Sequence, residues 1–437
     1  MKKTFLLMLG FIMAASMYAQ VWDGTATSWT SGSGSQADPY LIETPQHLAY
    51  LSEQVRAGET YEGKYFKLAS DLDMGGDKDL KFSPIGFFDE YVDPEDQSKI
   101  IDDSKYFLGV FDGNYKTIDN VYIYYVDEVN SVGGTGLFAC ISGNAVIKNL
   151  SIGNRSKIEG LDSSGLFVGT MKGGTISNCV NNAELSLESG WYHGGIVGLM
   201  NGGVISGCVN RAKITSLTGV AGIAGYVDGD VIIENCYNTS EICFTGMYGG
   251  GLVGSIDSGV LRNSYNYGKV WTPDEFGYMW GAAVAGSVGW DDSWKIENCY
   301  YLTYSDGLTD ENTGVTAKTE AEMKGADFLA ALDKGQGVWV ADGQNLNSGY
   351  PILKWQADIA SSISNVTSEI SGDIIVDGHN VSTTIAGARS IVITSLDGQV
   401  VVQGDINDGG VYVPAKGYFV ATVYGDGVKH SRKIIIK

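Results

Sequence analysis

The chain has 437 residues, a net charge of −22, and 60 glycines against only 7 prolines. A surface this acidic repels nucleic acids and anionic lipid headgroups, so we expect neither as a partner. Many glycines with few prolines indicate tight turns and close backbone contacts rather than a disordered linker.

The first segment is typical of an export signal. Two lysines precede an apolar run from Phe5 to Ala15, which is too short to span a membrane as a helix. We expect a signal peptide over residues 1–19, cleaved after Ala19, with cleavage after Ser16 as the alternative. No later stretch is long and apolar enough for a transmembrane helix. The sequence therefore predicts an exported protein.

Residues 20–357 are expected to form one domain that begins with a cap. From Pro39 to Gly58 the pattern predicts a strand and then a helix, with Thr44 as the N-cap and Pro45 in the first turn. Such a helix would cover the open edges at the end of a stack of strands. Irregular strands are expected over Tyr65–Met74, Tyr106–Asp112 and Thr117–Tyr124, and an acidic inserted loop over Asp89–Asp103.

A tandem repeat occupies the middle of the chain. Its landmark is a hydrophobic residue followed by glycine, and the copies are spaced 29, 27, 29 and 32 residues apart. They are Val168-Gly169, Val197-Gly198, Ala224-Gly225, Val253-Gly254 and Ala285-Gly286. The segments between glycines are short and rich in Ile, Val and Tyr, which is typical of strands. A propeller blade needs a longer period, and the spacing of leucine-rich repeats is absent. The sequence predicts an all-β fold, a right-handed parallel β-helix or solenoid with short capping helices.

Four of the six cysteines share one repeat position, three residues after a column of Ile or Leu. They are Cys179, Cys208, Cys236 and Cys299. An Asn bend between the two columns can place both in the core, because Asn tolerates a left-handed backbone. We interpret these cysteines as stacked, buried thiols rather than disulfides. A further column is expected to stack its amides along a turn, and consists of Asn181, Asn210, Asn238 and Asn266.

The repeat stops after Tyr304. A short helix is predicted over Thr319–Asp333, with Thr319 and Glu322 as a capping box. The polar stretch 358–369 is expected to be a linker. Residues 370–437 alternate short apolar runs with Asp-Gly and Gly-Gly turns, which predicts a small β-sandwich.

These segments resemble known families. The Gly-hydrophobic-hydrophobic-Gly core of each repeat, as in Gly251-Leu252-Val253-Gly254, resembles the GLUG motif of bacterial surface proteins, including non-catalytic regions of M26-type immunoglobulin A peptidases. The opening Pro39–Ile42 and the closing Gly349–Trp355 are similar to parts of such proteins, and the resemblance covers about residues 37–357. The tail from Ser395 to Lys437 resembles C-terminal sorting domains of type IX secretion cargo in Gram-negative bacteria. That resemblance implies contact with the secretion machinery and an extracellular or outer-membrane surface location.

The motifs of common hydrolases are absent. The M26 resemblance would require His-Glu-x-x-His, but the four histidines are scattered and no two have helical i, i+4 spacing. They are His47, His193, His379 and His430. No Gly-x-Ser-x-Gly elbow is present, and the Gly-x-Gly-x-x-Gly at 249–254 is a repeat feature without a following helix. Asp71 and Asp73 resemble the start of a calcium loop, but the EF-hand order fails, so a solvated turn is favoured. We expect no catalytic residue, metal or cofactor.

An enzyme is still an alternative, as a polysaccharide lyase or glycosidase built on a β-helix. Its candidate carboxylates lie near equivalent turns of adjacent repeats. They are Asp228, Asp230 and Asp257. Aspartates in turns are more often there for the turn itself.

One feature of the repeat suits recognition. Tyr192, Tyr248 and Trp280 each lie six residues before a landmark glycine, with Trp191 beside the first, while Gly219 interrupts the series. Met247 and Met279 also adjoin it. Stacked on successive repeats, these rings would form an aromatic strip onto which apolar sugar faces can lie. Alternatively, the rings pack under a loop or line the core. The main hypothesis is a secreted or surface-attached, non-catalytic, adhesin-like protein that binds glycan or host protein, and a structural spacer is a further alternative.

Overall fold

The computed structural model describes residues 21–125, 134–273, 280–366, 373–385, 388–395, 400–406, 410–425 and 428–436. The chain divides into two compact units. The first comprises Met1–Ala341 and Asn347–Leu353, and the second comprises Asp342–Leu346 and Lys354–Lys437. The predicted signal peptide, residues 1–19, lies outside the described residues.

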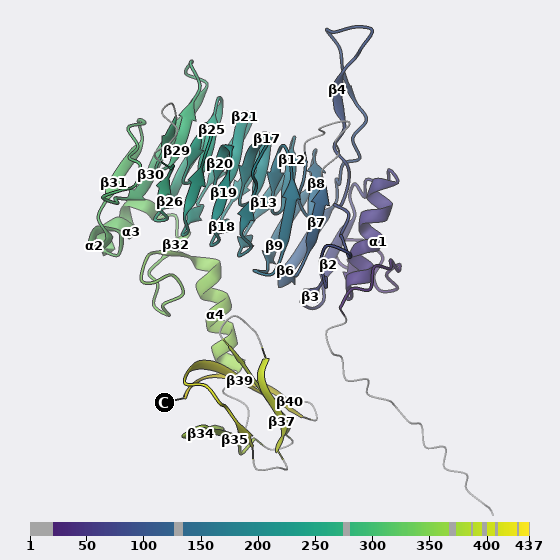
Figure 1. Ribbon diagram of the computed structural model, residues 1–437, viewed down its shortest axis with the longest axis vertical. Coiled ribbons are helices and arrows are strands. Elements are labelled where there is room, and N and C mark those ends of the chain that lie inside the picture. The colour runs from purple at the N-terminus through teal and green to yellow at the C-terminus, as the bar shows by residue number, and fades with distance from the viewer. Residues whose placement is uncertain are drawn as a thin grey trace, which may run out of the picture. The chain divides into compact units, whose positions relative to one another are not determined.

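The repeats of the first unit stack on one another through parallel strand pairing (Figure 1). Each landmark residue pairs with its own copy in the next repeat, from Val168 with Val197 to Val253 with Ala285. The strands concerned are β8 (Phe138–Ile141), β12 (Val168–Met171), β17 (Val197–Ser206), β21 (Ala224–Glu234), β25 (Val253–Ile256) and β29 (Ala285–Val288). The predicted register and the mostly-β, parallel character of the unit are confirmed.

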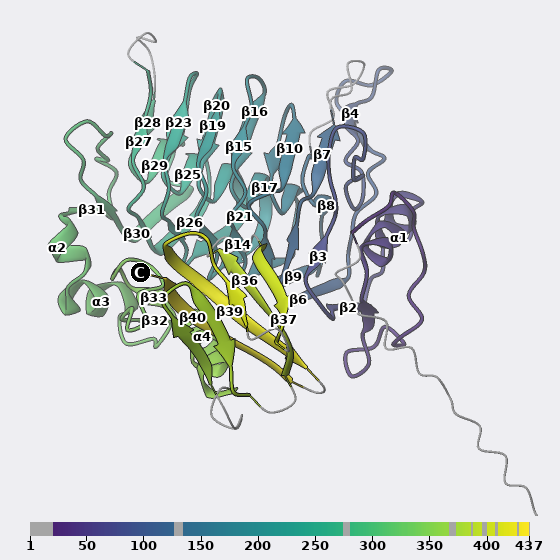
Figure 2. The same ribbon diagram turned by 60° about the horizontal axis from the view of Figure 1, so that its bottom comes forward.

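The second half of each repeat continues the same sheet. Its strands are β9 (Val146–Ile152), β13 (Thr175–Ser177), β14 (Val180–Asn181), β18 (Val209–Asn210), β22 (Tyr237–Asn238), β26 (Gly259–Asn266), β30 (Trp294–Leu302) and β31 (Val315–Lys318). Two smaller parallel sheets complete the repeat (Figure 2). One contains β11 (Ser164–Gly165), β16 (Trp191–Gly194), β20 (Thr218–Ala221), β24 (Gly249–Gly250) and β28 (Gly281–Ala282). The other contains β15 (Leu185–Ser186), β19 (Ile214–Ser216), β23 (Ile242–Phe244) and β27 (Val270–Trp271).

The predicted Asn bends let two neighbouring columns share the core. Asn178 and Asn235 have φ angles of 54°, and Gly207 takes the equivalent position with a φ of 66°. The left-handed residue resets the strand alternation, so the Ile column before it and the Cys column after it are both buried. All six cysteines are buried free thiols, which confirms the interpretation of the four column cysteines.

The predicted Asn column forms a buried amide ladder. Asn181 Nδ2 donates to Asn210 Oδ1 at 2.7 Å, Asn210 to Asn238 at 2.7 Å, and Asn238 to Asn266 at 2.8 Å. Each of the four side chains also donates to a carbonyl oxygen two residues further along. The ladder therefore satisfies polar groups that would otherwise be costly to bury.

The N-terminal cap forms as predicted. β1 (Tyr40–Ile42) leads into α1 (Pro45–Arg56), whose N-cap Thr44 accepts a hydrogen bond from the His47 backbone N–H at 3.3 Å. β1 pairs with β2 (Tyr65–Leu68), which pairs with β6 (Val110–Asp119), and β6 pairs with β9 of the repeats. The shorter strands here are β3 (Leu72–Asp73), β7 (Tyr122–Tyr125) and β10 (Lys157–Gly160).

Several predicted segments differ in the structure. The strands expected over Tyr106–Asp112 and Thr117–Tyr124 are found as β6 and β7, with shifted bounds. The expected loop Asp89–Asp103 contains an antiparallel hairpin of β4 (Glu90–Val92) and β5 (Ile100–Asp102), because β-branched and aromatic residues flank its turn. The expected single helix Thr319–Asp333 is two helices, α2 (Glu320–Met323) and α3 (Ala326–Asp333), because Gly325 breaks it. The predicted capping box of Thr319 and Glu322 is present. A two-stranded pairing of β32 (Trp339–Val340) with β33 (Ile352–Leu353) ends the unit.

The second unit contains a helix where a linker was expected. α4 (Lys354–Val366) covers most of residues 358–369, since this stretch lacks glycine and proline and Lys354 pairs with Asp358 at 2.6 Å. Two antiparallel sheets follow and share one apolar core, as the predicted sandwich requires. They consist of β34 (Ile374–Asp377), β35 (Asn380–Thr383) and β38 (Val411–Tyr412), and of β36 (Ala388–Ser395), β37 (Val400–Asp405), β39 (Gly417–Gly425) and β40 (Val428–Ile436).

Candidate functional site

The aromatic residues singled out in the sequence lie on successive repeats. Trp191 and Tyr192 belong to β16, Tyr248 directly precedes β24, and Trp280 directly precedes β28. The Gly249 N–H donates to the Trp280 carbonyl at 3.2 Å, which places the last two in one column. Met279, which was expected beside Trp280, lies outside the described residues. We call Trp191, Tyr192, Tyr248 and Trp280 the aromatic strip.

The backbone at the strip is unusual for aromatic residues. Tyr192 and Tyr248 have φ angles of 68° and 63°, and Gly219 between them has a φ of 66°. A bulky residue rarely adopts this left-handed region, and such strain costs of the order of 1–3 kcal/mol. Glycine would suit the position without this cost. Two tyrosines are nevertheless present, which points to a use for their side chains.

The rings of the strip form parallel and edge contacts, and several are open to solvent. Tyr248 and Trp280 are stacked, with ring centroids 5.6 Å apart and an interplanar angle of 11°. Trp191 packs edge-on against Tyr192 at 6.2 Å. The exposed fractions of Trp280 and Trp191 are 59% and 42%, whereas Tyr192 and Tyr248 are half-buried. The strip therefore presents flat apolar surface outside the core.

Gly219 does not leave the expected gap in the strip. A Cβ at this position would lie 2.8 Å from Cδ1 of Tyr192, so the Tyr192 ring occupies the space beside Gly219. A side chain at 219 would displace that ring. The glycine that interrupts the sequence pattern thus allows the tyrosine of the preceding repeat to extend across it.

Tyr226 joins the strip, although the sequence did not single it out. Its ring lies 4.5 Å from that of Tyr192, and its hydroxyl donates to Asp257 Oδ2 at 2.7 Å. Burial raises the pKa of Tyr226, and Asp257 raises it further. Burial and Asp257 likewise raise the pKa of Tyr192. Both phenols are therefore protonated at neutral pH and can donate hydrogen bonds. The only sequence signal for Tyr226 was its place directly after the landmark Ala224-Gly225.

The three candidate carboxylates lie on adjacent repeats, Asp228 and Asp230 within β21 and Asp257 directly after β25. Ser258 Oγ donates to Asp228 Oδ1 at 2.7 Å, and Asp257 precedes that serine. Asp230 lies on the same strand as Asp228, within two residues of it. Among the described residues, none of the three forms an ion pair with a lysine or arginine. Asp228 and Asp257 each accept a hydrogen bond from a hydroxyl group of the neighbouring repeat, and the Asp257 partner is Tyr226 beside the aromatic strip.

His193 and the turn at Asp73 are held by specific contacts. His193 is buried, its Nδ1 lies 2.7 Å from Ser216 Oγ, and its Nε2 lies 2.6 Å from the Leu161 carbonyl. Burial lowers its pKa to about 4. Asp73 receives hydrogen bonds from Arg155 and Asn120, each at 3.0 Å. No group of three or more potential metal ligands occurs in the described part of the chain.

Comparisons with known proteins give one partial match. No family model matches the chain, and no solved structure matches it significantly. The chain is 29% identical over 148 residues to a protein of Evansella cellulosilytica whose name describes it as a Gly-rich membrane protein. The match spans 33% of this chain and only 14% of that relative. Across the described residues, no helix is long and apolar enough to cross a membrane.

Proposed function

We propose that the protein is an exported, non-catalytic binding protein that recognises glycan through the aromatic strip. The observation that carries this proposal is the stacked pair of half-buried Tyr248 and exposed Trp280. Parallel rings on successive repeats form a platform for the apolar face of a sugar ring. Near the Tyr192 end of the strip, the Asp257 carboxylate can accept hydrogen bonds from sugar hydroxyls, and the Tyr192 phenol can donate one.

The first unit is best described as a right-handed parallel β-helix. Repeats that pair in parallel and pass through three sheets per copy support this description, and parallel crossover connections are almost always right-handed. Neighbouring copies in such a stack are about 4.8 Å apart. A long polymer could therefore contact equivalent positions of several repeats. Host surface proteins that carry such glycans are the corresponding cellular partners.

Export and surface location follow from the resemblances rather than from the site. The GLUG-like repeats and the tail similar to type IX sorting domains both favour a bacterial surface or extracellular protein. The membrane description of the partly matching relative fits the same location. We therefore propose that the second unit directs secretion while the first unit binds.

A glycan array probed with the mature chain tests the binding function. We expect binding to a defined set of glycans, and Trp280→Ala should weaken it about tenfold or more, since a buried aromatic contact is worth roughly 1–3 kcal/mol. Tyr91→Ala, an exposed aromatic on the β4 hairpin, is the matched control and should bind normally. Equal binding by all three proteins would exclude the aromatic strip as the glycan site.

Two further readouts distinguish the binding function from the enzyme and the structural spacer. If a bound polysaccharide is shortened during incubation, and Asp257→Asn abolishes the shortening, the protein is a polysaccharide-active enzyme. If no glycan binds and adhesion of cells that display the protein is unchanged by Trp280→Ala, a structural spacer is the better description. Mass spectrometry of the incubated glycans and a cell-adhesion assay provide these two readouts.

A further inference from the structure

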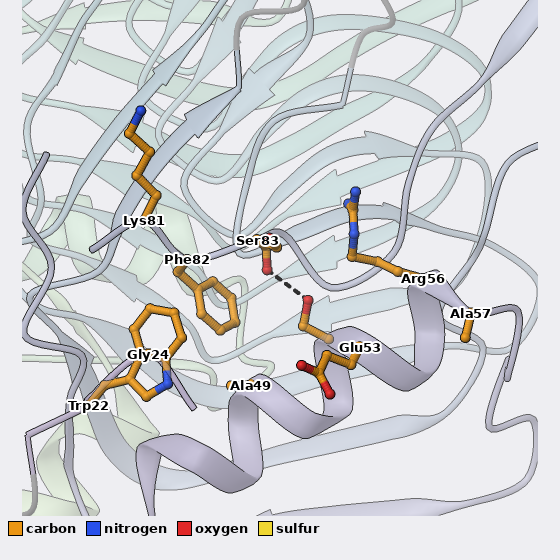
Figure 3. Close-up of a pocket in the computed structure, with 10 residues that line it drawn as sticks. Trp22, Gly24, Ala49, Glu53, Arg56, Ala57, Lys81, Phe82 and Ser83 are labelled. Atoms are coloured by element: carbon orange, nitrogen blue, oxygen red, sulfur yellow. Dashed lines mark hydrogen bonds between the residues drawn. The ribbon is translucent and has the colours of Figure 1, made fainter. Parts of the chain in front are cut away.

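A pocket of about 500 Å³ lies beside α1 in the N-terminal cap, on elements that do not carry the aromatic strip. Its walls are formed by the segment before β1, by one face of α1 and by the segment before β4 (Figure 3). The lining includes the side chains of Trp22, Ser52, Glu53, Arg56, Lys81 and Phe82. They come together only in the folded chain, because the segments lie up to about 60 residues apart in sequence.

One wall of the pocket is apolar and firmly held. The Trp22 and Phe82 rings meet edge to face at 5.7 Å, and both are almost completely buried. The Trp22 indole N–H donates to the Thr25 carbonyl at 2.8 Å. Ser52 Oγ lies 2.8 Å from the Ser83 carbonyl, which ties α1 to the opposite wall. The pocket is therefore formed before any ligand binds.

The charged groups of the pocket are positioned but not neutralised. Arg56 Nη1 donates to the Gly86 carbonyl at 3.0 Å, and Lys81 Nζ lies 4.3 Å from the centre of the Tyr124 ring. Neither cation forms an ion pair with a described residue, although acidic residues outnumber basic ones by 51 to 29 in this chain. Glu53 likewise forms no ion pair within the described ranges. In Figure 3 its carboxylate turns toward Trp22 and Phe82, whereas Arg56 and Lys81 lie on opposite sides of Ser83.

We propose that this pocket binds a small sugar that carries a carboxylate, such as a hexuronate. The remaining N–H groups of the Arg56 guanidinium would bind the carboxylate, because the Gly86 contact already fixes the orientation of this planar donor. Lys81 adds positive charge, the small accessible edges of Phe82 and Trp22 form the apolar wall, and Glu53 accepts hydrogen bonds from sugar hydroxyls. The site is independent of the aromatic strip and of the function proposed for it.

Isothermal titration calorimetry of the full-length mature protein with glucuronate tests the proposal. We expect glucuronate to bind, with glucose and acetate at least tenfold weaker, because each lacks one part of the recognised ligand. Arg56→Gln should weaken glucuronate binding by about 10- to 100-fold, as expected for the loss of a charged hydrogen bond. Glu53→Gln should weaken glucuronate and leave the response to acetate unchanged.

Matched variants keep the test independent of folding and of the aromatic strip. Glu62→Gln and Lys64→Gln make the same charge changes on exposed residues that do not line the pocket, and both should bind like the wild type. Lys81→Gln changes an exposed side chain and tests the positive charge if Arg56→Gln lowers the melting temperature. Trp280→Ala should not affect glucuronate binding. Equal affinity for glucose would overturn the carboxylate contact, equal affinity for acetate would overturn sugar recognition, and no binding would overturn the proposal.

Discussion

At the scale of single residues, the amide ladder shows how the repeat uses polar groups in its core. Asn210 donates to Asn238 and to the Ala212 carbonyl, and accepts from Asn181, while remaining fully buried. A buried amide of this kind stabilises only when all its partners are present, because each orphaned partner loses its water without a replacement.

Removing one member of the ladder should therefore destabilise the folded protein. We expect Asn210→Ala to lower the free energy of unfolding by about 2–4 kcal/mol, since it deletes hydrogen bonds and leaves the facing amide groups without partners. The control is Asn201→Ala, an exposed residue of β17, which should change the stability by less than about 0.5 kcal/mol. Denaturant unfolding followed by circular dichroism measures both. Similar losses in the two variants would contradict a special role for the ladder.

A second residue-scale prediction concerns acid sensitivity. The buried His193 has a pKa of about 4 in the folded protein, against 6.5 for an unperturbed histidine. The unfolded chain therefore binds a proton first as the pH falls, and the folded state loses stability between pH 6.5 and 4. The loss amounts to about 3 kcal/mol over that interval.

Unfolding of the wild type and of His193→Gln, measured across this pH range, checks the prediction. The variant should be less stable at pH 7, because it disturbs the contacts with Ser216 and Leu161. Its stability should nevertheless decline less steeply on acidification than that of the wild type. Parallel pH profiles would show that His193 does not titrate as described.

At the scale of elements, the left-handed bend separates the Ile strand from the Cys strand. Asn178 adopts a φ of 54°, and Gly207 fills the same position in the next repeat. Asn and Gly tolerate this region because Asn has a short polar side chain and Gly has no Cβ, whereas a β-branched residue is strained there.

The loss of stability on substitution of Asn178 should depend on whether the new residue tolerates the left-handed backbone, and not on the size of its side chain. We expect Asn178→Val to destabilise the protein by about 2 kcal/mol or more, and Asn178→Gly by less than about 1 kcal/mol. Thermal unfolding of both variants provides the comparison. If valine were tolerated as well as glycine, the left-handed bend would not control the alternation between the two columns.

At the scale of the whole molecule, the N-terminal cap covers the end of the strand stack and keeps it from pairing with another chain. β1 pairs with one edge of β2, and α1 buries Leu48, Leu51 and Val55 against the core. Without them, β2 would present an unpaired edge and apolar side chains, which is a template for association with another chain.

Deletion of residues 21–58 should therefore cause self-association. We expect oligomers in size-exclusion chromatography with light scattering, at a protein concentration where the intact chain gives a single smaller species. The intact protein and Leu51→Ala, which keeps the cap but weakens its packing, are the controls. A truncated protein that is folded and has the same oligomeric state as the intact chain would contradict the capping role.

The sequence by itself determined the register of the repeat, the Asn bends, the amide ladder and the N-terminal cap. These features were predictable because each repeat meets the same environment as its neighbours, so one physical requirement recurs at a fixed spacing and becomes visible as a column. The positions of Trp191, Tyr192, Tyr248 and Trp280 on successive repeats followed from the same periodicity. The contacts between their rings did not follow from the periodicity.

Only the tertiary structure decided which side chains meet across non-equivalent positions. Tyr226 joins Tyr192, and the Tyr192 ring covers Gly219, because side-chain direction depends on local backbone angles that periodicity does not encode. The pocket beside α1 is formed by segments outside the repeat, so no periodic column in the sequence predicts it. The hairpin at β4 and the break at Gly325 were likewise settled by local packing and backbone preference. The sequence therefore determined the repeating scaffold, because each repeat meets the same environment, whereas contacts between non-equivalent positions depended on the tertiary structure.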